Sequence, residues 1–251
     1  MWGRVTYPYP ARDGGVLQRG LVRDRARLFG PIVHVMTAFG WLLSFGLLAS
    51  SSNVITFDRN SLGKTPPGWT IPMTSREAAP RWQIVRDPTA PTLYVLAQTS
   101  SDVHSDRFPL AILDRINMRD GDVSVRLKAV SGRHDQTGGL VFRYRDEKNY
   151  YAVRADAMGD DVELYRVDNG RFVPILPRGR PPAGFEVKHD IPANAWQILK
   201  VSFHGNQFQV YVNHRRLFQA QDSTYTGPGK VGLCTAADSV TYFNDFRVYP
   251  K

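Results

Sequence analysis

The stretch GGLVFRYRDEKNYYAVRA, from Gly138 to Ala155, decides the fold of this 251-residue chain. It contains two runs in which apolar residues alternate with polar ones, on either side of the polar tetrapeptide Asp146–Asn149. Such alternation with a polar interruption predicts an antiparallel β-hairpin. The tetrapeptide is the expected turn, so Arg145 should pair with Tyr150, and the pairs should continue outward one residue at a time.

This pairing separates two sets of side chains, because neighbouring residues of a strand point to opposite faces. One set predicts the core and contains Leu140, Phe142, Tyr144, Tyr151, Val153 and Ala155. The opposite set contains Val141, Arg143, Arg145, Tyr150, Ala152 and Arg154. The chain continues through a second turn, DAMGD, which sets three further pairs opposite one another: Val153 and Leu164, Arg154 and Glu163, Ala152 and Tyr165.

The polar face of the three expected strands is the candidate ligand-binding surface. Aromatic rings stack on the C–H groups of sugars, and guanidinium forks bind hydroxyls or carboxylates. The alternative is a solvated sheet face with a cross-strand ion pair worth about 0.2–1 kcal/mol. The residues predicted to contact a glycan are Arg143, Arg145, Tyr150, Arg154, Glu163 and Tyr165.

From Val54 onward the chain shows the same pattern of short runs in which apolar and polar residues alternate, and Gly, Pro, Asp and Asn separate these runs. About twelve strands and no amphipathic helix of three turns are expected, which is typical of an all-β sandwich or barrel. One long proline-rich loop, residues 174–195, separates the strands of the first half from those of the second.

The first 51 residues have a different composition. Six arginines and two aspartates lie in residues 1–49, and the segment from Gly30 to Ser50 carries no formal charge. A basic flank before an apolar run predicts a signal peptide, cleaved after Ala49 or Ser51, or an uncleaved hydrophobic helix that anchors the chain with its N-terminus in the cytoplasm. A third interpretation is a buried core helix. Both leading interpretations place residues 52–251 outside the cytoplasm, as a secreted, periplasmic or membrane-anchored domain that meets the membrane only through this segment.

A family resemblance rests on the opening stretch, on Trp196 with LKVSFHGNQFQVYVNHRRLF, and on GPGKVGLCTAADSVTYFNDFRV, in that order. Together they resemble the concanavalin A-like, laminin-G-type jelly roll, and in particular exported bacterial domains related to family 66 carbohydrate-binding modules and to the 3-keto-disaccharide hydrolase domain. The resemblance covers Val54 to Tyr249. It implies two antiparallel sheets, adjacent first and last strands, and carbohydrate bound on the concave sheet. This fold hosts lectins, hydrolases, lyases and adhesion modules, so it does not by itself define a function.

A structural calcium ion is a further implication of the resemblance, near the place where the terminal strands meet. Asp58 and Asp245 are the candidate ligands, with Asn244 beside them and Asp238 as a third carboxylate. Calcium prefers six to eight oxygen ligands. The alternative is that these aspartates cap turns.

Catalytic signatures are sparse. The four glutamates, Glu77, Glu147, Glu163 and Glu186, do not form the E-x-D-x-(x)-E pattern of the family 16 glucanases. The histidines lack metal-ligand spacing, and the single cysteine, Cys234, has no neighbouring histidine. Tyrosines beside arginines on the polar face would permit a lyase.

The sequence therefore predicts residues 52–251 to be an exported jelly-roll domain that binds carbohydrate without catalysis. A glycoside hydrolase or polysaccharide lyase of the same fold is the first alternative, and a structural or adhesion domain of the cell envelope is the second. No Lys/Arg run predicts nucleic-acid binding. Nothing in the sequence indicates an oligomeric state.

Overall fold

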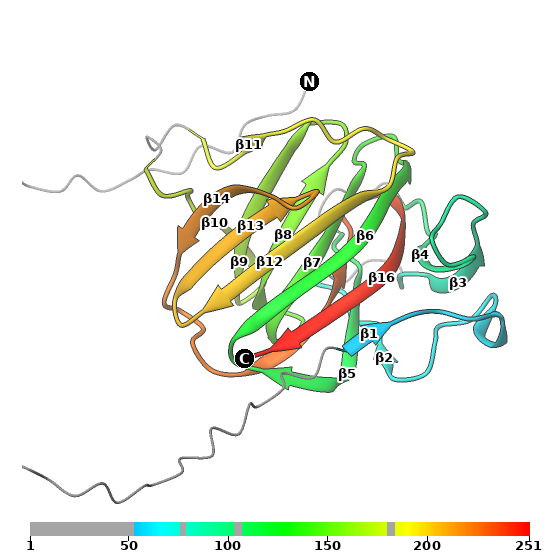
Figure 1. The fold of residues 1–251 in the computed structure, drawn as a ribbon, viewed down its shortest axis with the longest axis horizontal. Helices are drawn as coiled ribbons and strands as arrows, with labels where there is room; N and C mark the ends of the chain where they lie inside the picture. Colours follow the sequence, from blue (N-terminus) through cyan, green and yellow to red (C-terminus); the bar gives the residue numbers. More distant parts are fainter. Residues whose placement is uncertain (1–52, 76–78, 103–106, 180–183) are drawn as a thin grey trace, which may run out of the picture. The chain divides into compact units, whose positions relative to one another are not determined.

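The computed structural model describes residues 53–75, 79–102, 107–179 and 184–251, which form two antiparallel β-sheets packed face to face (Figure 1). Sheet A contains eight strands. Its order across the sheet is β14 (Arg215–Gln221), β13 (Gln207–Val212), β12 (Gln197–His204), β6 (Gly121–Ser131), β16 (Val240–Pro250), β4 (Tyr94–Gln98) and β3 (Trp82–Arg86), and β1 (Asn53–Ile55) also pairs with β16.

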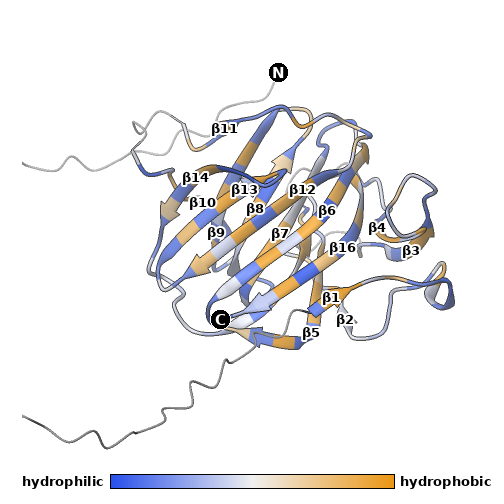
Figure 2. Cartoon of the chain, in the orientation of Figure 1, coloured by the Kyte–Doolittle hydropathy of each residue, from blue (hydrophilic) through white to orange (hydrophobic). Residues whose placement is uncertain are grey.

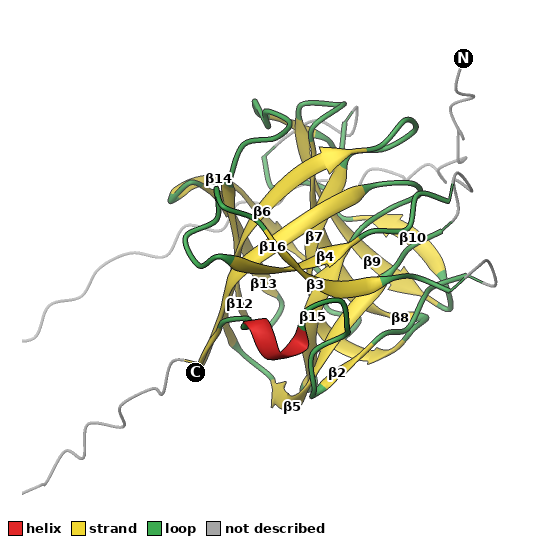
Figure 3. Cartoon of the chain, turned by 90° about the vertical axis from the view of Figure 1, so that its right-hand side faces the viewer, coloured by secondary structure: helices red, strands yellow, loops and turns green. Residues whose placement is uncertain are grey.

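Sheet B also contains eight strands among the described residues. Its order is β10 (Arg171–Pro174), β9 (Asp161–Asp168), β8 (Asn149–Asp156), β7 (Thr137–Asp146), β15 (Gly229–Cys234), β5 (Leu110–Met118) and β2 (Trp69–Thr70), and β11 (Val187–Lys188) also pairs with β9. A 3-10 turn, η1 (Arg59–Ser61), is the one helical element in the described part of the chain (Figure 3).

The core lies between the sheets because the strands alternate buried and partly exposed residues. In β12, for example, Leu199, Val201 and Phe203 point inward and the residues between them point outward. Figure 2 shows the same alternation as changes of colour along the strands of sheet A. The rings of Phe142 in sheet B and Phe203 in sheet A lie 4.8 Å apart between centroids, so the two sheets are in direct contact.

The outer face of sheet B carries a second apolar layer. It contains Leu110, Ile112, Val141, Tyr150, Ala152, Val167 and Cys234, all buried. The segment around Thr74 covers part of this layer: Thr74 donates its backbone N–H to Phe108, and its hydroxyl lies 2.7 Å from that of Tyr150. The centre of this face is therefore closed to solvent.

These features confirm the predicted all-β sandwich of two antiparallel sheets. The adjacent terminal strands are also confirmed, because β1 pairs with β16 in register from Asn53 opposite Val248 to Ile55 opposite Phe246. The predicted N-terminal hydrophobic helix lies outside the described residues. Within the described residues, no helix is long and apolar enough to cross a membrane.

Candidate functional site

The pairing of β8 with β9 agrees with the sequence prediction. Arg154 lies opposite Glu163, Ala152 opposite Tyr165, and Val153 opposite Leu164. Both strands keep strict alternation through this region, so the residues predicted to share the outer face do share it. This outer face supplies the candidate site.

The predicted pairing of β7 with β8 is wrong beyond the turn. Asp146 pairs with Asn149 as expected, but Phe142 pairs with Tyr151, so residues 143–145 of β7 lie opposite Tyr150 alone. This bulge begins at Arg143, whose backbone has a positive φ of 48°. A bulge reverses which side chains face the core. Tyr144, predicted in the core, consequently packs on the outer layer, with its ring 6.0 Å from that of Tyr150.

Arg143, predicted to contact a ligand, is instead fully buried on the core side of sheet B. Its guanidinium donates to three backbone carbonyls, at 3.0 Å (Arg119), 2.7 Å (Tyr225) and 2.6 Å (Gly205), and to the carboxylate of Asp120 at 3.1 Å. It also lies 5.4 Å from the ring centroid of Phe203. Arg143 therefore ties together loops at one end of the sandwich.

Arg145 also lies apart from the other predicted contact residues. It is exposed, and its guanidinium stacks 4.5 Å from the ring centroid of Tyr225. Tyr225 belongs to the main core. The bulge thus separates Arg143 and Arg145 from Arg154, and the six predicted contact residues do not form one surface.

The Arg154 site consists of Arg154, Glu163 and Tyr165 on β8 and β9, with Phe108, Phe172 and Phe185 around them. Arg154 donates to Glu163 at 2.7 Å and lies 3.4 Å from the Tyr165 hydroxyl, with its guanidinium 4.8 Å from the Tyr165 ring centroid. The side chains of Arg154 and Glu163 are 15% and 10% exposed, so the pair is mostly buried and only a small part of it reaches the surface.

The charge of Arg154 is permanent. Burial alone would lower its pKa, but Tyr165, Glu163 and Asp135 together raise the pKa above its ordinary value. Its Nε is buried and has no hydrogen-bond partner among the described residues. A buried donor without a partner costs free energy, and a ligand could bond to this N–H only after the neighbouring side chains moved aside.

Tyr150 lies on the same outer face of β8, in contact with Thr74. Its side chain is fully buried, and burial raises the pKa of its hydroxyl. The hydroxyl bonds to Thr74. A ring with no exposed face cannot stack on a sugar, so Tyr150 belongs to the buried layer of this face and not to the ligand surface.

Three partly exposed phenylalanines at the Arg154 site were not singled out from the sequence. Phe108 and Phe172 pack in a tilted arrangement with ring centroids 3.9 Å apart, and Phe172 and Phe185 each make a T-shaped contact with Tyr165 at 5.8 Å. Phe185 lies in the long proline-rich loop. The long loop was the sequence feature that could have indicated Phe185 as a site residue, because long loops often carry functional residues.

Asp135 is a second carboxylate near Arg154 that the sequence did not reveal. It precedes β7 and accepts hydrogen bonds from the hydroxyls of Thr137 and Ser239. Burial raises the pKa of Asp135 to about 6, although Arg154 and the two hydroxyls oppose the shift. Near neutral pH this carboxyl can take up and release a proton.

The two aspartates predicted to bind calcium have other partners. Asp58 accepts the backbone N–H of Asn60 at 2.8 Å and caps η1. Asp245 accepts two hydrogen bonds from Arg247, both at 2.8 Å, and lies 3.5 Å from Arg126. No group of three or more His, Cys, Asp or Glu side chains suited to a metal occurs within the described ranges. The residues present do not fit calcium, whose binding stays an untested prediction.

Asp238, the third carboxylate considered, has a structural role. It is buried and accepts the backbone N–H groups of three successive residues, Arg133, His134 and Asp135. Although burial alone would raise its pKa, these donors lower the pKa of Asp238 below its ordinary value. The carboxylate fixes the β6–β7 loop that carries Asp135.

Comparison with known proteins agrees with the fold. No family model matches the sequence. A segment of 115 residues, 45% of this chain, is 29% identical to the levanase of Bacillus subtilis, and it spans 15% of that protein.

Solved structures share the sandwich over most of their length. The carbohydrate-binding module CBM66 from Bacillus subtilis matches with a TM-score of 0.53 at 22% identity, over 75% of this chain and 96% of the module. Domain 4 of AbnA, an extracellular family 43 arabinanase from Geobacillus stearothermophilus solved with arabinotriose, matches with a TM-score of 0.50 at 14% identity, over 79% and 93%. These likenesses confirm the predicted jelly-roll fold.

Proposed function

We propose that this chain is a carbohydrate-binding protein without catalytic activity and that the glycan binds at the Arg154 site. The observation that carries the proposal is the arrangement of Arg154: its guanidinium is held by Glu163 and Tyr165, phenylalanine rings surround it, and its Nε–H has no hydrogen-bond partner among the described residues. A few oriented polar groups within an aromatic rim are typical of small-ligand sites.

The local charge favours a neutral sugar over a uronate. Glu163 neutralises Arg154 directly, and Asp135 interacts with the same guanidinium. A ligand carboxylate would therefore approach two protein carboxylates as well as one cation. Sugar hydroxyls, in contrast, can donate to Glu163 and accept from Arg154.

The relatives support the same class of ligand. One similar structure is named as a carbohydrate-binding module, another was solved with arabinotriose, and the partial sequence match is to a levanase. Each name describes that protein, and the glycan bound by this chain is to be found by experiment.

The test is a glycan array probed with the full-length chain, followed by titration of the best-bound glycan. We expect Arg154→Gln to weaken binding at least about tenfold, which corresponds to about 1.4 kcal/mol. The matched control is Arg166→Gln, because Arg166 lies on the neighbouring strand β9, is 20% exposed and is paired with Asp222 at 2.5 Å. Absence of any bound glycan, or equal loss in both variants, would contradict the proposal and favour a structural or adhesion role.

A hydrolase is the second candidate function, and Asp135 is the observation that favours it. Asp135, with a pKa of about 6 raised by burial and also by the nearby Asp156 carboxylate, has the protonation behaviour that a general acid needs. Incubation with the best-bound oligosaccharide followed by chromatography would decide between the two. Shortened products that disappear in Asp135→Asn would establish catalysis, and an unchanged oligosaccharide would leave a binding domain.

We also propose that the described domain is exported. The uncharged segment from Gly30 to Ser50 and the extracellular arabinanase among the similar structures support this. The measurement is a reporter enzyme, active only outside the cytoplasm, fused after Lys251. An inactive reporter on a stably produced fusion would refute export.

A further inference from the structure

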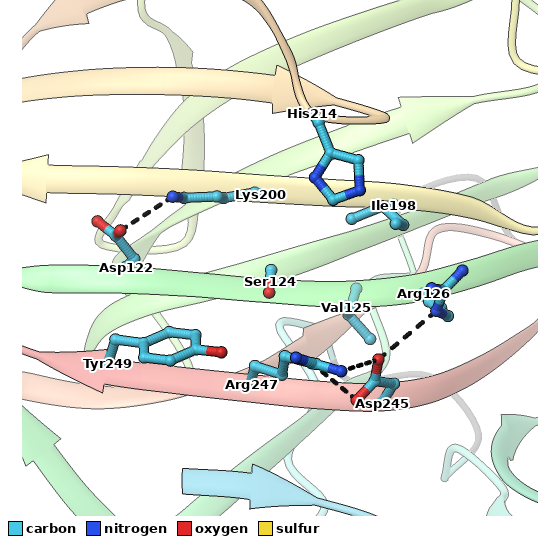
Figure 4. A pocket seen from close by; sticks show the side chains of 10 residues that line it. All are labelled: Asp122, Ser124, Val125, Arg126, Ile198, Lys200, His214, Asp245, Arg247 and Tyr249. Atoms are coloured by element: carbon cyan, nitrogen blue, oxygen red, sulfur yellow. Dashed lines mark hydrogen bonds and ion pairs between the residues drawn. The ribbon is translucent and has the colours of Figure 1, made fainter. Parts of the chain in front are cut away.

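A separate hollow lies on the outer face of sheet A, on the sheet that does not carry the Arg154 site. It has a volume of about 430 Å³ and crosses β16, β6 and β12, with His214 of the β13–β14 turn at its edge (Figure 4). Small-ligand pockets typically measure about 300–1,000 Å³. The hollow is therefore large enough to hold one or two sugar rings.

The register of the strands explains the depression. Ser124 on β6 lies directly between Arg247 on β16 and Lys200 on β12. A small side chain between two long ones leaves space above it. Asp245 and Arg247 are two residues apart on β16 and share the outer face, and Asp245 has a positive φ of 52° at a bulge in this strand.

The hollow is positively charged. Arg126, Lys200 and Arg247 line it together with only two carboxylates. Asp245 is held by both arginines, and Asp122 is held by Lys200 at 2.9 Å and also by Lys251 at 3.0 Å. Among the lining residues the three cations exceed the two carboxylates by one, so an anionic group at the floor would meet net positive charge.

Two rings complete the lining. Figure 4 shows Tyr249 and His214 on opposite sides of Ser124. Their faces can contact the C–H groups of a sugar while the cations bind its charged group. The combination of rings with arginine and lysine fits a charged sugar better than either a free anion or a neutral glycan.

We propose that the hollow on sheet A is a second ligand site, which binds a carboxylate-bearing sugar of an acidic glycan. The two sites would then divide the ligand chemistry between the two sheets: balanced charge at the Arg154 site for neutral sugars, and excess positive charge here for uronates. The inference does not depend on the proposed function of the Arg154 site.

The test is calorimetric titration of the full-length chain with trigalacturonate and, in parallel, with neutral galactotriose. We expect Lys200→Gln and Ser124→Phe each to weaken trigalacturonate binding at least about tenfold. The first variant removes a cation, and the second fills the hollow and keeps every charge. The affinity of the chain for galactotriose should be unchanged in both variants.

The matched control is Lys230→Gln on sheet B. Lys230 is 40% exposed and pairs with Asp114 at 3.1 Å, while Lys200 is 37% exposed and pairs with Asp122 at 2.9 Å. Lys230→Gln should change trigalacturonate affinity less than twofold. The proposal is wrong if the native chain does not bind trigalacturonate, if Lys230→Gln weakens binding as much as Lys200→Gln, or if acetate at equal carboxylate concentration displaces the sugar.

Discussion

Replacement of Arg143 by methionine is the sharpest test of the structure, because the sequence pattern placed this residue on the ligand surface and the structure buries it. Methionine keeps an apolar stem and removes the guanidinium. Four hydrogen bonds are then lost, three of them to backbone carbonyls and one to Asp120.

The expected cost follows from those partners. Hydrogen bonds that involve a charged group contribute about 1.5–3 kcal/mol each, and they are not additive. Removing one member of a buried ion pair costs about 3–5 kcal/mol. Asp120 keeps the backbone N–H of Gly205 at 2.8 Å, which limits the penalty on its carboxylate. We therefore expect Arg143→Met to lower the free energy of unfolding by about 3–5 kcal/mol.

The assay is urea unfolding followed by tryptophan fluorescence, with Arg145→Met as the control. Arg145 is two residues away and exposed, and its stacking on Tyr225 contributes about 0.5–1 kcal/mol. If Arg143→Met lost no more stability than Arg145→Met, the buried hydrogen-bond network of the Arg143 guanidinium would be refuted. The prediction that Arg143 lies on the ligand surface would then have to be reconsidered.

Three further predictions concern stability. Asp238→Ala should lower the free energy of unfolding by about 2–4 kcal/mol and Asp238→Asn by less, because the amide keeps one acceptor oxygen. Since the folded-state pKa of Asp238 is lowered, its contribution should be complete above the unfolded pKa of about 4 and lost as the pH falls below it, and a Tm series from pH 7 to pH 3 checks this. For Asp135 the sign is opposite: its folded pKa of about 6 lies above the unfolded value of about 4, so stability should fall by up to about 3 kcal/mol between pH 4 and pH 7. Urea titrations at both pH values should show that slope in the native chain and a flat profile in Asp135→Asn; a sloped profile in the variant would assign the effect to another group. Gly232→Ala should destabilise by more than about 2 kcal/mol, because its Cβ would lie 2.3 Å from the carbonyl oxygen of Ala111, whereas Gly184→Ala has no atom within 4 Å and should leave the Tm unchanged.

The sequence predicted the β8–β9 half of the candidate site because those strands keep a regular two-residue period. Arg154, Glu163 and Tyr165 needed only that period and one turn to be placed together. The prediction for the side chains of β7 was wrong for a local reason. A bulge at a non-glycine residue leaves no mark in the pattern, and Arg143 adopts a left-handed backbone without the Gly or Asn that would indicate one.

The alternation pattern could not predict which residues from distant segments of the chain reach the site. Asp135 bonds to Ser239, more than one hundred positions away in the sequence, and only the arrangement of the sheets brings them together. The covering of Tyr150 by the segment around Thr74 is of the same kind. Alternation predicted which face Tyr150 occupies, but alternation along a strand carries no information about which loop lies above it.

The pairing of β1 with β16 has a consequence for engineering. Asn53 lies opposite Val248, so the two ends of the described sandwich are neighbouring strands of one sheet (Figure 1). A short glycine-rich linker could join Lys251 to Asn53, and new termini could be opened at the exposed turn between His204 and Gln207. Such a circular permutant would keep every strand pairing, and the same geometry would allow the sandwich to be inserted as a cassette into a surface loop of another protein.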